Sequence, residues 1–240
     1  MQDWREWFSA GSGIDRVQGF ITPRSVRAIR CLLAHQDDAA IGGSIAEIGT
    51  FRGKTFIGLA AATRDGERVV GVDIFPDGVQ QSLLNSAREF LDEEQLKRIS
   101  LVKRDSSNLK FQEWSNILGS RARFVHVDGN HTNLAVRYDI MLAASHLNEG
   151  GIVLIDDFLH DWYPDVTEGI IDALRLIPNI VPVAVIPRSG DLLKGGTKLV
   201  CAEKASSEVY RNLLISEFSE IRPRNFSVAG SVVTGFMNID

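Results

Sequence analysis

The chain has 240 residues, of which 44% are hydrophobic, and a formal net charge of −5. This length allows one substantial core, and the acidic balance argues against a nucleic acid or an anionic membrane as the main partner. Two distant cysteines, Cys31 and Cys201, fit a reducing compartment. No stretch approaches the ~20 apolar residues of a membrane span. The charged N-terminus lacks the apolar run of a signal peptide, so we expect a cytoplasmic protein.

The predicted elements alternate between short apolar runs and helical stretches. A first helix is expected from Thr22 to about Gln36, because Thr22 can cap it and Pro23 suits its first turn. Apolar runs typical of strands follow at Ser44–Ile48, Val69–Ile74, Ile99–Val102, Phe124–Val127 and Ile152–Ile155. Helices are expected between and after them at Thr55–Thr63, Val79–Leu91, Leu109–Leu118, Thr132–Leu147 and Val166–Leu176. This alternation predicts βαβ units and a mostly parallel sheet with helices on both faces.

The last third of the chain closes the predicted sheet. Val181–Ile186 and Lys198–Ala202 are expected to be two strands of a hairpin around Arg188–Gly196. Glu208–Phe218 is the last expected helix, and the tail to Asp240 has no clear period. Because no linker interrupts the pattern, we expect one domain over residues 1–240. It would comprise an N-terminal helical segment (1–40), a core sheet (43–203) and a C-terminal helix and tail (204–240).

An acidic residue ends each of the first five predicted strands. These residues are Glu47, Asp73, Asp105, Asp128 and the pair Asp156-Asp157. Ligands of open α/β sheets bind beyond the carboxyl ends of the strands, so these side chains would meet at one edge. A single acid there would be read as a helix cap or a loop residue. Five strands that share the feature predict a functional edge.

The segment Ala46–Thr55 reads A-E-I-G-T-F-R-G-K-T and ends like a phosphate-binding P-loop. A P-loop needs four residues between its two glycines, however, and Gly49 and Gly53 enclose only three. A ring of acids also suits a cationic sulfonium and ribose hydroxyls better than a polyphosphate. The spacing and the charge therefore argue against a nucleotide triphosphate site, and we expect Lys54 to be a surface residue.

Three segments carry a resemblance to a known family. They are A-E-I-G-T-F-R-G-K-T (46–55), F-V-H-V-D-G-N-H-T (124–132) and G-G-I-V-L-I-D-D (150–157). Together they resemble the class I S-adenosylmethionine-dependent methyltransferases, and within them the metal-dependent O-methyltransferases of sugar and natural-product biosynthesis, a group sometimes labelled cephalosporin-hydroxylase-like. The resemblance covers about residues 43–173. It implies a Rossmann-like α/β fold with a seven-stranded, mostly parallel sheet whose last strand is antiparallel.

The resemblance also implies roles for the residues of this edge. Gly49, Thr50 and Gly53 would let the backbone pack against the methionine part of S-adenosylmethionine. Glu47 would face its ammonium group, and Thr55 its carboxylate at a helix N-terminus. The ribose hydroxyls would bind Asp73, and Asp105 and Ser106 would contact the adenine. Asp128 completes the expected cofactor site.

Asp128, Asp156 and Asp157 end neighbouring strands, so their carboxylates are expected to converge. Three converging carboxylates repel one another, and a bound cation is the natural way to keep them ionised. Oxygen ligands point to a hard ion, first of all Mg²⁺, with Mn²⁺ or Ca²⁺ as alternatives. Because neighbouring residues of a regular strand point to opposite faces, the chain must leave the strand at Asp156-Asp157.

His131 is the candidate general base, three residues after Asp128. A histidine can accept the proton of a hydroxyl that attacks the methyl group, and a metal would acidify that hydroxyl. The alternative is that His131 caps the helix that begins near Thr132. His126 is expected to be a hydrogen-bonded core residue, and His160 a loop residue.

The sequence leaves the acceptor open beyond a small hydroxylated molecule such as a sugar or natural-product moiety. Trp162, Tyr163 and Pro164 would either stack on it or pin their loop to the core. Aromatic residues near the N-terminus, Trp4, Trp7 and Phe8, indicate a core stripe or contacts of a homo-oligomer. A catalytically inactive cofactor-binding partner protein is the alternative function, and a kinase is a weak third.

Overall fold

The computed structural model describes residues 3–9, 11–190 and 195–236 of the chain. Every strand and helix expected from the sequence is present, with ends that differ by a few residues. The strands are β1 (Ser44–Ile48), β2 (Val69–Asp73), β3 (Ile99–Lys103), β4 (Ala122–Val127), β5 (Leu147–Ile155), β6 (Ile180–Ile186), β7 (Lys198–Glu203), β8 (Arg224–Val228) and β9 (Ser231–Gly235). The loop of the predicted hairpin around Arg188–Gly196 lies partly outside the described residues, at 191–194.

Helices and short 3₁₀ turns connect these strands. The N-terminal segment holds α1 (Trp4–Trp7), α2 (Gly13–Arg16) and α3 (Pro23–Asp38). The others are α4 (Lys54–Ala61), α5 (Val79–Phe90), α6 (Glu93–Lys97), η1 (Ser106–Asn108), α7 (Phe111–Leu118), α8 (Asn133–Ser145), α9 (Pro164–Leu176), η3 (Lys204–Ser206) and α10 (Ser207–Glu217). None of the described helices is long and apolar enough to cross a membrane.

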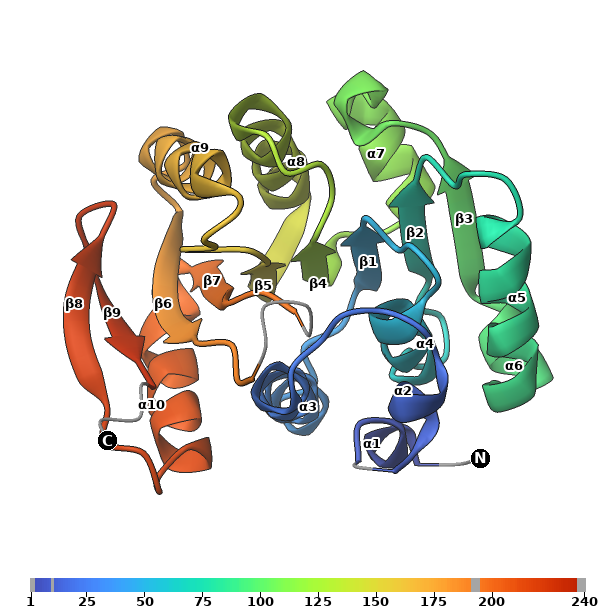
Figure 1. The fold of residues 1–240 in the computed structure, drawn as a ribbon, viewed down its shortest axis with the longest axis horizontal. Helices are drawn as coiled ribbons and strands as arrows, with labels where there is room; N and C mark the ends of the chain where they lie inside the picture. The colour runs from blue at the N-terminus through green and yellow to red at the C-terminus, as the bar shows by residue number, and fades with distance from the viewer. Residues whose placement is uncertain (1–2, 10, 191–194, 237–240) are drawn as a thin grey trace.

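One sheet runs through the molecule in the order β3-β2-β1-β4-β5-β7-β6-β9-β8 (Figure 1). The strands β1 to β5 are parallel, and β7 lies antiparallel between β5 and β6. The chain builds outward from β1 to β3 and then returns to the other side of β1 with β4. Loops that leave β1 and β4 therefore diverge, and ligands bind at such a switch point.

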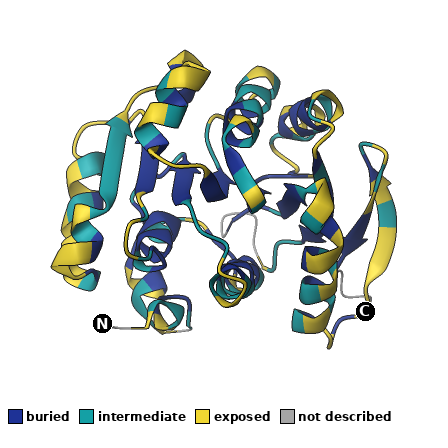
Figure 2. Ribbon diagram, turned by 180° about the vertical axis from the view of Figure 1, so that it is seen from behind, coloured by how far each residue is buried: buried dark blue, intermediate teal, exposed yellow. Residues whose placement is uncertain are grey.

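Helices cover both faces of the sheet. In Figure 1, α7, α8 and α9 lie on one side and α3, α4 and α10 on the other. Alternate residues of the central strands feed the two cores: Ala46 and Ile48 face one, whereas Ile45 faces the other. The central strands are buried along their length, and the exposed residues lie on the outer helices and at the β8 edge (Figure 2).

The tail departs from the sequence prediction, because it adds two strands. β8 and β9 form an antiparallel hairpin, and β9 pairs in parallel with β6. The sheet thus has nine strands where seven were expected, and it extends past residue 203. Val233 is fully buried and Val228 nearly so, and these two side chains anchor the hairpin to the core. The last four residues of the tail, 237–240, lie outside the described residues.

The N-terminal aromatic residues belong to the core of their own chain. Trp7 and Phe8 are buried against α4, at a place where a side chain at Gly58 would collide with both rings. They form the core stripe that was one of the two expectations. A homo-oligomer stays a prediction, and these two buried residues lend it no support.

Candidate functional site

The loops that leave β1 and β4 touch at the switch point of the sheet. The Asp128 amide donates to the Ile48 carbonyl at 2.8 Å, and the Gly49 amide donates to the Val72 carbonyl at 2.8 Å. Gly49 has a φ of +88°, and a side chain there would collide with the backbone carbonyl of Asp128. Contact within the protein therefore requires glycine at this position, independently of any cofactor.

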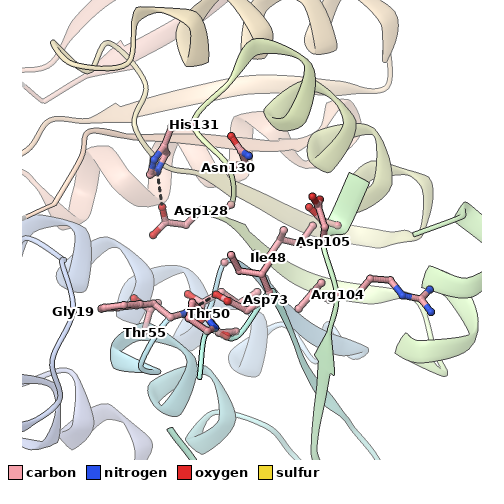
Figure 3. A pocket seen from close by; sticks show the side chains of 18 of the residues that line it. Gly19, Ile48, Thr50, Thr55, Asp73, Arg104, Asp105, Asp128, Asn130 and His131 are labelled. Atoms are coloured by element: carbon pink, nitrogen blue, oxygen red, sulfur yellow. Dashed lines mark hydrogen bonds and ion pairs between the residues drawn. The ribbon is translucent and has the colours of Figure 1, made fainter. Parts of the chain in front are cut away.

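A cavity of about 500 Å³ opens beside this contact, a size typical of sites for small molecules and cofactors. It lies at the carboxyl ends of β1, β2 and β4, with Asp73 and Thr50 at one end and His131 with Asp128 at the other (Figure 3). Nine residues predicted for the site line it: Glu47, Gly49, Thr50, Thr55, Asp73, Asp105, Ser106, Asp128 and His131. The predicted Gly53 is not among the lining residues; it begins α4 and packs against Leu83.

Asp73, at the end of β2, is held in a fixed orientation by the backbone. One carboxylate oxygen accepts a hydrogen bond from the Phe51 amide at 2.8 Å, and the other accepts one from the Phe75 amide at 2.7 Å. Each oxygen keeps a further lone pair for a donor in the cavity. The arrangement suits a ligand with neighbouring hydroxyl groups.

Glu47 brings a buried carboxyl group to the same cavity. One of its oxygens lies 2.7 Å from Nδ1 of His126, and both residues are almost wholly buried. Burial, followed by the nearby Asp128 charge, raises the pKa of Glu47 well above its usual value. Its second oxygen and the Thr50 hydroxyl are buried with no hydrogen-bond partner among the described residues. Glu47 and Thr50 both line the cavity, and a ligand that offered polar groups to these atoms would be favoured, since an unmade buried hydrogen bond is costly.

His126 is the hydrogen-bonded core residue that the sequence predicted. Burial, and after it the Lys198 charge, lowers its pKa to about 3, so the imidazole is neutral. It faces Glu47 across the β1–β4 pair, where the two residues are direct neighbours in register.

Asp105 and Ser106, at the start of η1, form another part of the cavity wall. Asp105 uses one carboxylate oxygen to accept bonds from the Ser107 amide and hydroxyl, at 2.9 Å and 2.7 Å, and so caps this turn. Ser106 is buried and lies near Asp139 of α8. Asp139 is fully buried, and neither of its oxygens has a hydrogen-bond partner of good geometry in the described part of the chain. Burial raises its pKa to about 7.

His131 lies between two of the predicted acids. Its Nε2 is 2.9 Å from an Asp157 oxygen and 3.8 Å from an Asp128 oxygen. The Asp128 and Asp157 carboxylates raise the pKa of His131 to about 10. Burial, together with the Asp156 charge, raises the pKa of Asp128 to about 7. His131 does not cap α8, whose N-cap is Thr132.

The side chains of Asp156 and Asp157 point in different directions at the end of β5. Asp157 has a φ of +57°, so the chain leaves the strand there, as the sequence predicted. The Asp157 carboxylate turns towards His131, whereas Asp156 forms an ion pair with Lys198, the first residue of β7. Two groups of close side chains could hold a metal ion: Asp128 with His131 and Asp157, and Asp128 with His126 and Asp156. The three carboxylates predicted as one ligand set are thus divided between them.

Lys198 is the residue that the sequence reasoning missed. The sequence does hold a signal for this residue, because Lys198 is a charged residue at the start of an otherwise apolar strand. An antiparallel strand begins at the edge where its parallel neighbours end, so a charged first residue of β7 faces the acids that follow β5.

Lys54 was expected on the surface, and the structure corrects this. Its Nζ donates to the Val17 carbonyl at 2.9 Å, and its side chain packs under Gly19, so it fastens the N-terminal segment beside the cavity. Phe20 of this segment and Phe51 line the cavity and stack at a centroid distance of 6.3 Å.

Aromatic rings surround His131 on the side of the loop that follows β5. Tyr163 stacks on His131 at 4.3 Å and on His160 at 4.9 Å. His160 is buried and accepts a hydrogen bond from the Trp162 amide, whereas the Trp162 side chain is more than half exposed. Tyr163 therefore holds the loop and orients His131, whereas Trp162 lies edge-on to His160 and does not line the cavity.

Comparison with known proteins agrees with this geometry. Residues 46–158 match the family model described as a methyltransferase domain. No curated protein matches the chain in sequence.

Solved structures of three O-methyltransferases share the fold. TomG from Streptomyces achromogenes, involved in tomaymycin synthesis and solved with S-adenosylmethionine, has a TM-score of 0.57 and 17% identity over 75% of this chain and 80% of its own. A Bacillus cereus O-methyltransferase, solved with S-adenosylhomocysteine, has a TM-score of 0.59 and 15% identity over 85% and 92% of the two chains. CalS11, a TDP-rhamnose 3'-O-methyltransferase of calicheamicin biosynthesis, has a TM-score of 0.57 and 16% identity over 74% and 78%. The predicted class I methyltransferase fold is confirmed by these structures.

Proposed function

We propose that this chain, which carries a methyltransferase domain, transfers the methyl group of S-adenosylmethionine to a hydroxyl group of a small molecule, a sugar or natural-product moiety. The observation that carries the proposal is the cavity at the β1–β4 switch point, whose wall includes Asp73, with a carboxylate held by two backbone amides, and Glu47, with an oxygen that has no hydrogen-bond partner among the described residues. The TDP-rhamnose and tomaymycin enzymes named above support the acceptor class by their similar folds.

The residues of the cavity fit the proposed cofactor. We assign the two Asp73 oxygens to the ribose hydroxyls and the spare Glu47 oxygen to the ammonium group; the backbone bonds that fix Asp73 and the unpartnered Glu47 oxygen support this assignment. A cation beside Glu47 would also favour the ionised form of this buried carboxyl. Thr50 contributes an unpartnered hydroxyl, and Thr55 lies in the first turn of α4. Ser106 lines the end expected to hold the adenine.

The cofactor, when bound, supplies an activated methyl group. The chain's own residues must then bring an acceptor oxygen into line with it and remove the hydroxyl proton. His131 lines the cavity and is the group we assign to proton removal. Tyr163 stacks on its ring and holds it in place.

A divalent cation, Mg²⁺ or alternatively Mn²⁺ or Ca²⁺, is the second proposed cofactor. The carboxylates of Asp128 and Asp157 fit it, because a hard ion prefers oxygen ligands and these two lie in a group of side chains, with His131 beside them, whose possible ligand atoms are within 4.8 Å of one another. A cation held by these two carboxylates would offset the charges that raise the pKa of His131 and would leave its imidazole able to accept a proton. Such an ion would supply Lewis-acid chemistry to the acceptor hydroxyl.

A methyl-transfer assay tests the function. The protein is incubated with S-adenosylmethionine, Mg²⁺ and a panel of nucleotide sugars, glycosides and phenols, and products are identified by mass spectrometry. We expect a mass gain of one methylene on a hydroxyl-bearing acceptor, and loss of this product when EDTA replaces Mg²⁺. Full activity in EDTA would remove the metal from the mechanism. Methylation of a nitrogen or carbon acceptor instead of oxygen would overturn the assigned reaction.

A further inference from the structure

We propose that Lys198 is a resident cation of the acidic cluster, defined as Asp128, Asp156 and Asp157, and that it keeps Asp156 out of the ligand set of the divalent metal. This inference rests on the proposed function for the presence of a metal. It differs from the sequence expectation, in which all three carboxylates bind the ion. It assigns Lys198 as a positioning residue and leaves Asp128 and Asp157 as the carboxylate ligands.

Lys198 reaches the acidic cluster because of the antiparallel course of β7. The last residues of β5 and the first of β7 are paired, with Ile155 opposite Leu199, so the next step brings Asp156 opposite Lys198. The Lys198 side chain is 1% exposed, and its Nζ forms an ion pair with Asp156. A buried ammonium without a partner is strongly destabilising, so the folded chain maintains this pair.

Both oxygens of Asp156 are engaged within the protein. One accepts a hydrogen bond from the Asp157 amide at 2.7 Å, and the other binds Lys198. The backbone at Gly196 packs against the carboxylates of both Asp157 and Asp156, so this contact does not distinguish them. Neither residue lines the cavity, and the difference between them is their partner: Asp157 faces His131, which does line it, whereas Asp156 faces Lys198.

The Lys198 charge also acts on its other neighbours. It favours the ionised forms of Asp128, Asp157 and Glu47, and it disfavours protonation of His126. A divalent ion seated against Asp156 would lie beside this ammonium and be repelled by it. An ion bound by Asp157 and Asp128 would lie on the His131 side, beside the group formed by Asp128, His131 and Asp157.

Binding of Mn²⁺ alone, without cofactor or acceptor, tests the inference. Free Mn²⁺ is followed by its electron paramagnetic resonance signal during titration of four proteins. These are the wild type, Lys198→Met, the double variant Lys198→Met/Asp156→Asn, and the control Lys103→Met. The control removes a positive charge from an exposed residue at the same edge of the sheet. Circular dichroism melts establish that each variant is folded.

We expect the double variant to bind Mn²⁺ within about threefold of the wild type, because the neutral pair removes neither a ligand nor net charge. Lys198→Met alone frees a carboxylate and should tighten binding by roughly tenfold or more, whereas Lys103→Met should not. A loss of tenfold or more in the double variant would make Asp156 a ligand and overturn the inference. Binding of Mn²⁺ by none of the proteins would also overturn it. Unchanged binding of S-adenosylmethionine in the same samples would show that the proposed function survives either failure.

Discussion

Asp139 is a buried acid whose contribution to the free energy of unfolding depends on pH. Its folded-state pKa is raised to about 7 from the ordinary 3.8, because burial disfavours the ionised form. The folded state therefore holds this proton more tightly than the unfolded state. The Asp139 contribution to stability is complete below pH ~4, falls as pH rises to about 7, and is constant above.

Asp139→Asn keeps the shape of the side chain and removes this ionisation. We expect the variant to exceed the wild type in free energy of unfolding by about 2–4 kcal/mol at pH 8, with an advantage that shrinks towards pH 5. Urea unfolding at several pH values measures the difference. Asp77→Asn, at an exposed position, serves as the control. A difference that does not change with pH would contradict the burial account.

His131 is expected to act in turnover and not in cofactor binding. His131→Ala should lower kcat by about 10²- to 10⁴-fold, the usual loss for a general base, and leave the Kd for S-adenosylmethionine nearly unchanged. Steady-state rates give kcat, and calorimetry gives the Kd. His146→Ala, at the end of α8, is the control. A pH–rate profile of the same shape in wild type and variant would exclude His131 as the base.

Site residues could be predicted from the sequence where they lie at the end of a strand. They could not be predicted where a strand distant in sequence supplies the partner. The acids after β1, β2, β3 and β4 were predicted because parallel strands end at one edge, and they line one cavity. Asp156 and Lys198 are 42 positions apart, and only the insertion of β7 beside β5 pairs them. The division of the acidic cluster followed from that contact and could not be predicted from spacing.

At the scale of the elements, the contact between the loops after β1 and β4 sets the strictest limit on side-chain size. Gly49 and Gly66 have similar φ values, +88° and +81°, but only Gly49 lies against another backbone segment. A side chain at Gly66 would meet nothing within 4 Å. The pair therefore separates the strain of a left-handed conformation from the loss of this contact.

We expect Gly66→Ala to lower the free energy of unfolding by about 1–2 kcal/mol, the cost of the left-handed conformation. Gly49→Ala should cost about 3 kcal/mol or more beyond that, since the β1 and β4 loops must separate. Chemical denaturation measures both. Equal losses in the two variants would show that the loops tolerate separation.

Strands and helices with a clear hydrophobic pattern were predicted from the sequence. Elements with a weak pattern were not. The strands of the parallel sheet read as continuous apolar runs because both faces are covered. β8 is an edge strand whose residues are mostly exposed, so it carries no such run and its hairpin was read as an irregular tail. The short α6 follows a capping box at Asp92 and Gln95 and was likewise missed.

At the scale of the whole molecule, topology brings the site together. Residues from the ends of β1, β2, β3 and β4 meet at one edge, and the N-terminal segment adds Gly19 and Phe20 to the same cavity. The parallel part of this arrangement follows from the βαβ pattern. The contribution of the N-terminal segment depends on the Lys54–Val17 contact, which no local pattern announces.

Calorimetric titration with S-adenosylmethionine and with ATP, each with Mg²⁺, tests the central claim most directly. The account predicts one molecule of S-adenosylmethionine bound per chain and no measurable binding of ATP. Asp73→Ala should weaken the cofactor by about tenfold or more, since it removes a charged acceptor from both ribose hydroxyls. Tight binding of ATP without binding of S-adenosylmethionine would contradict the account.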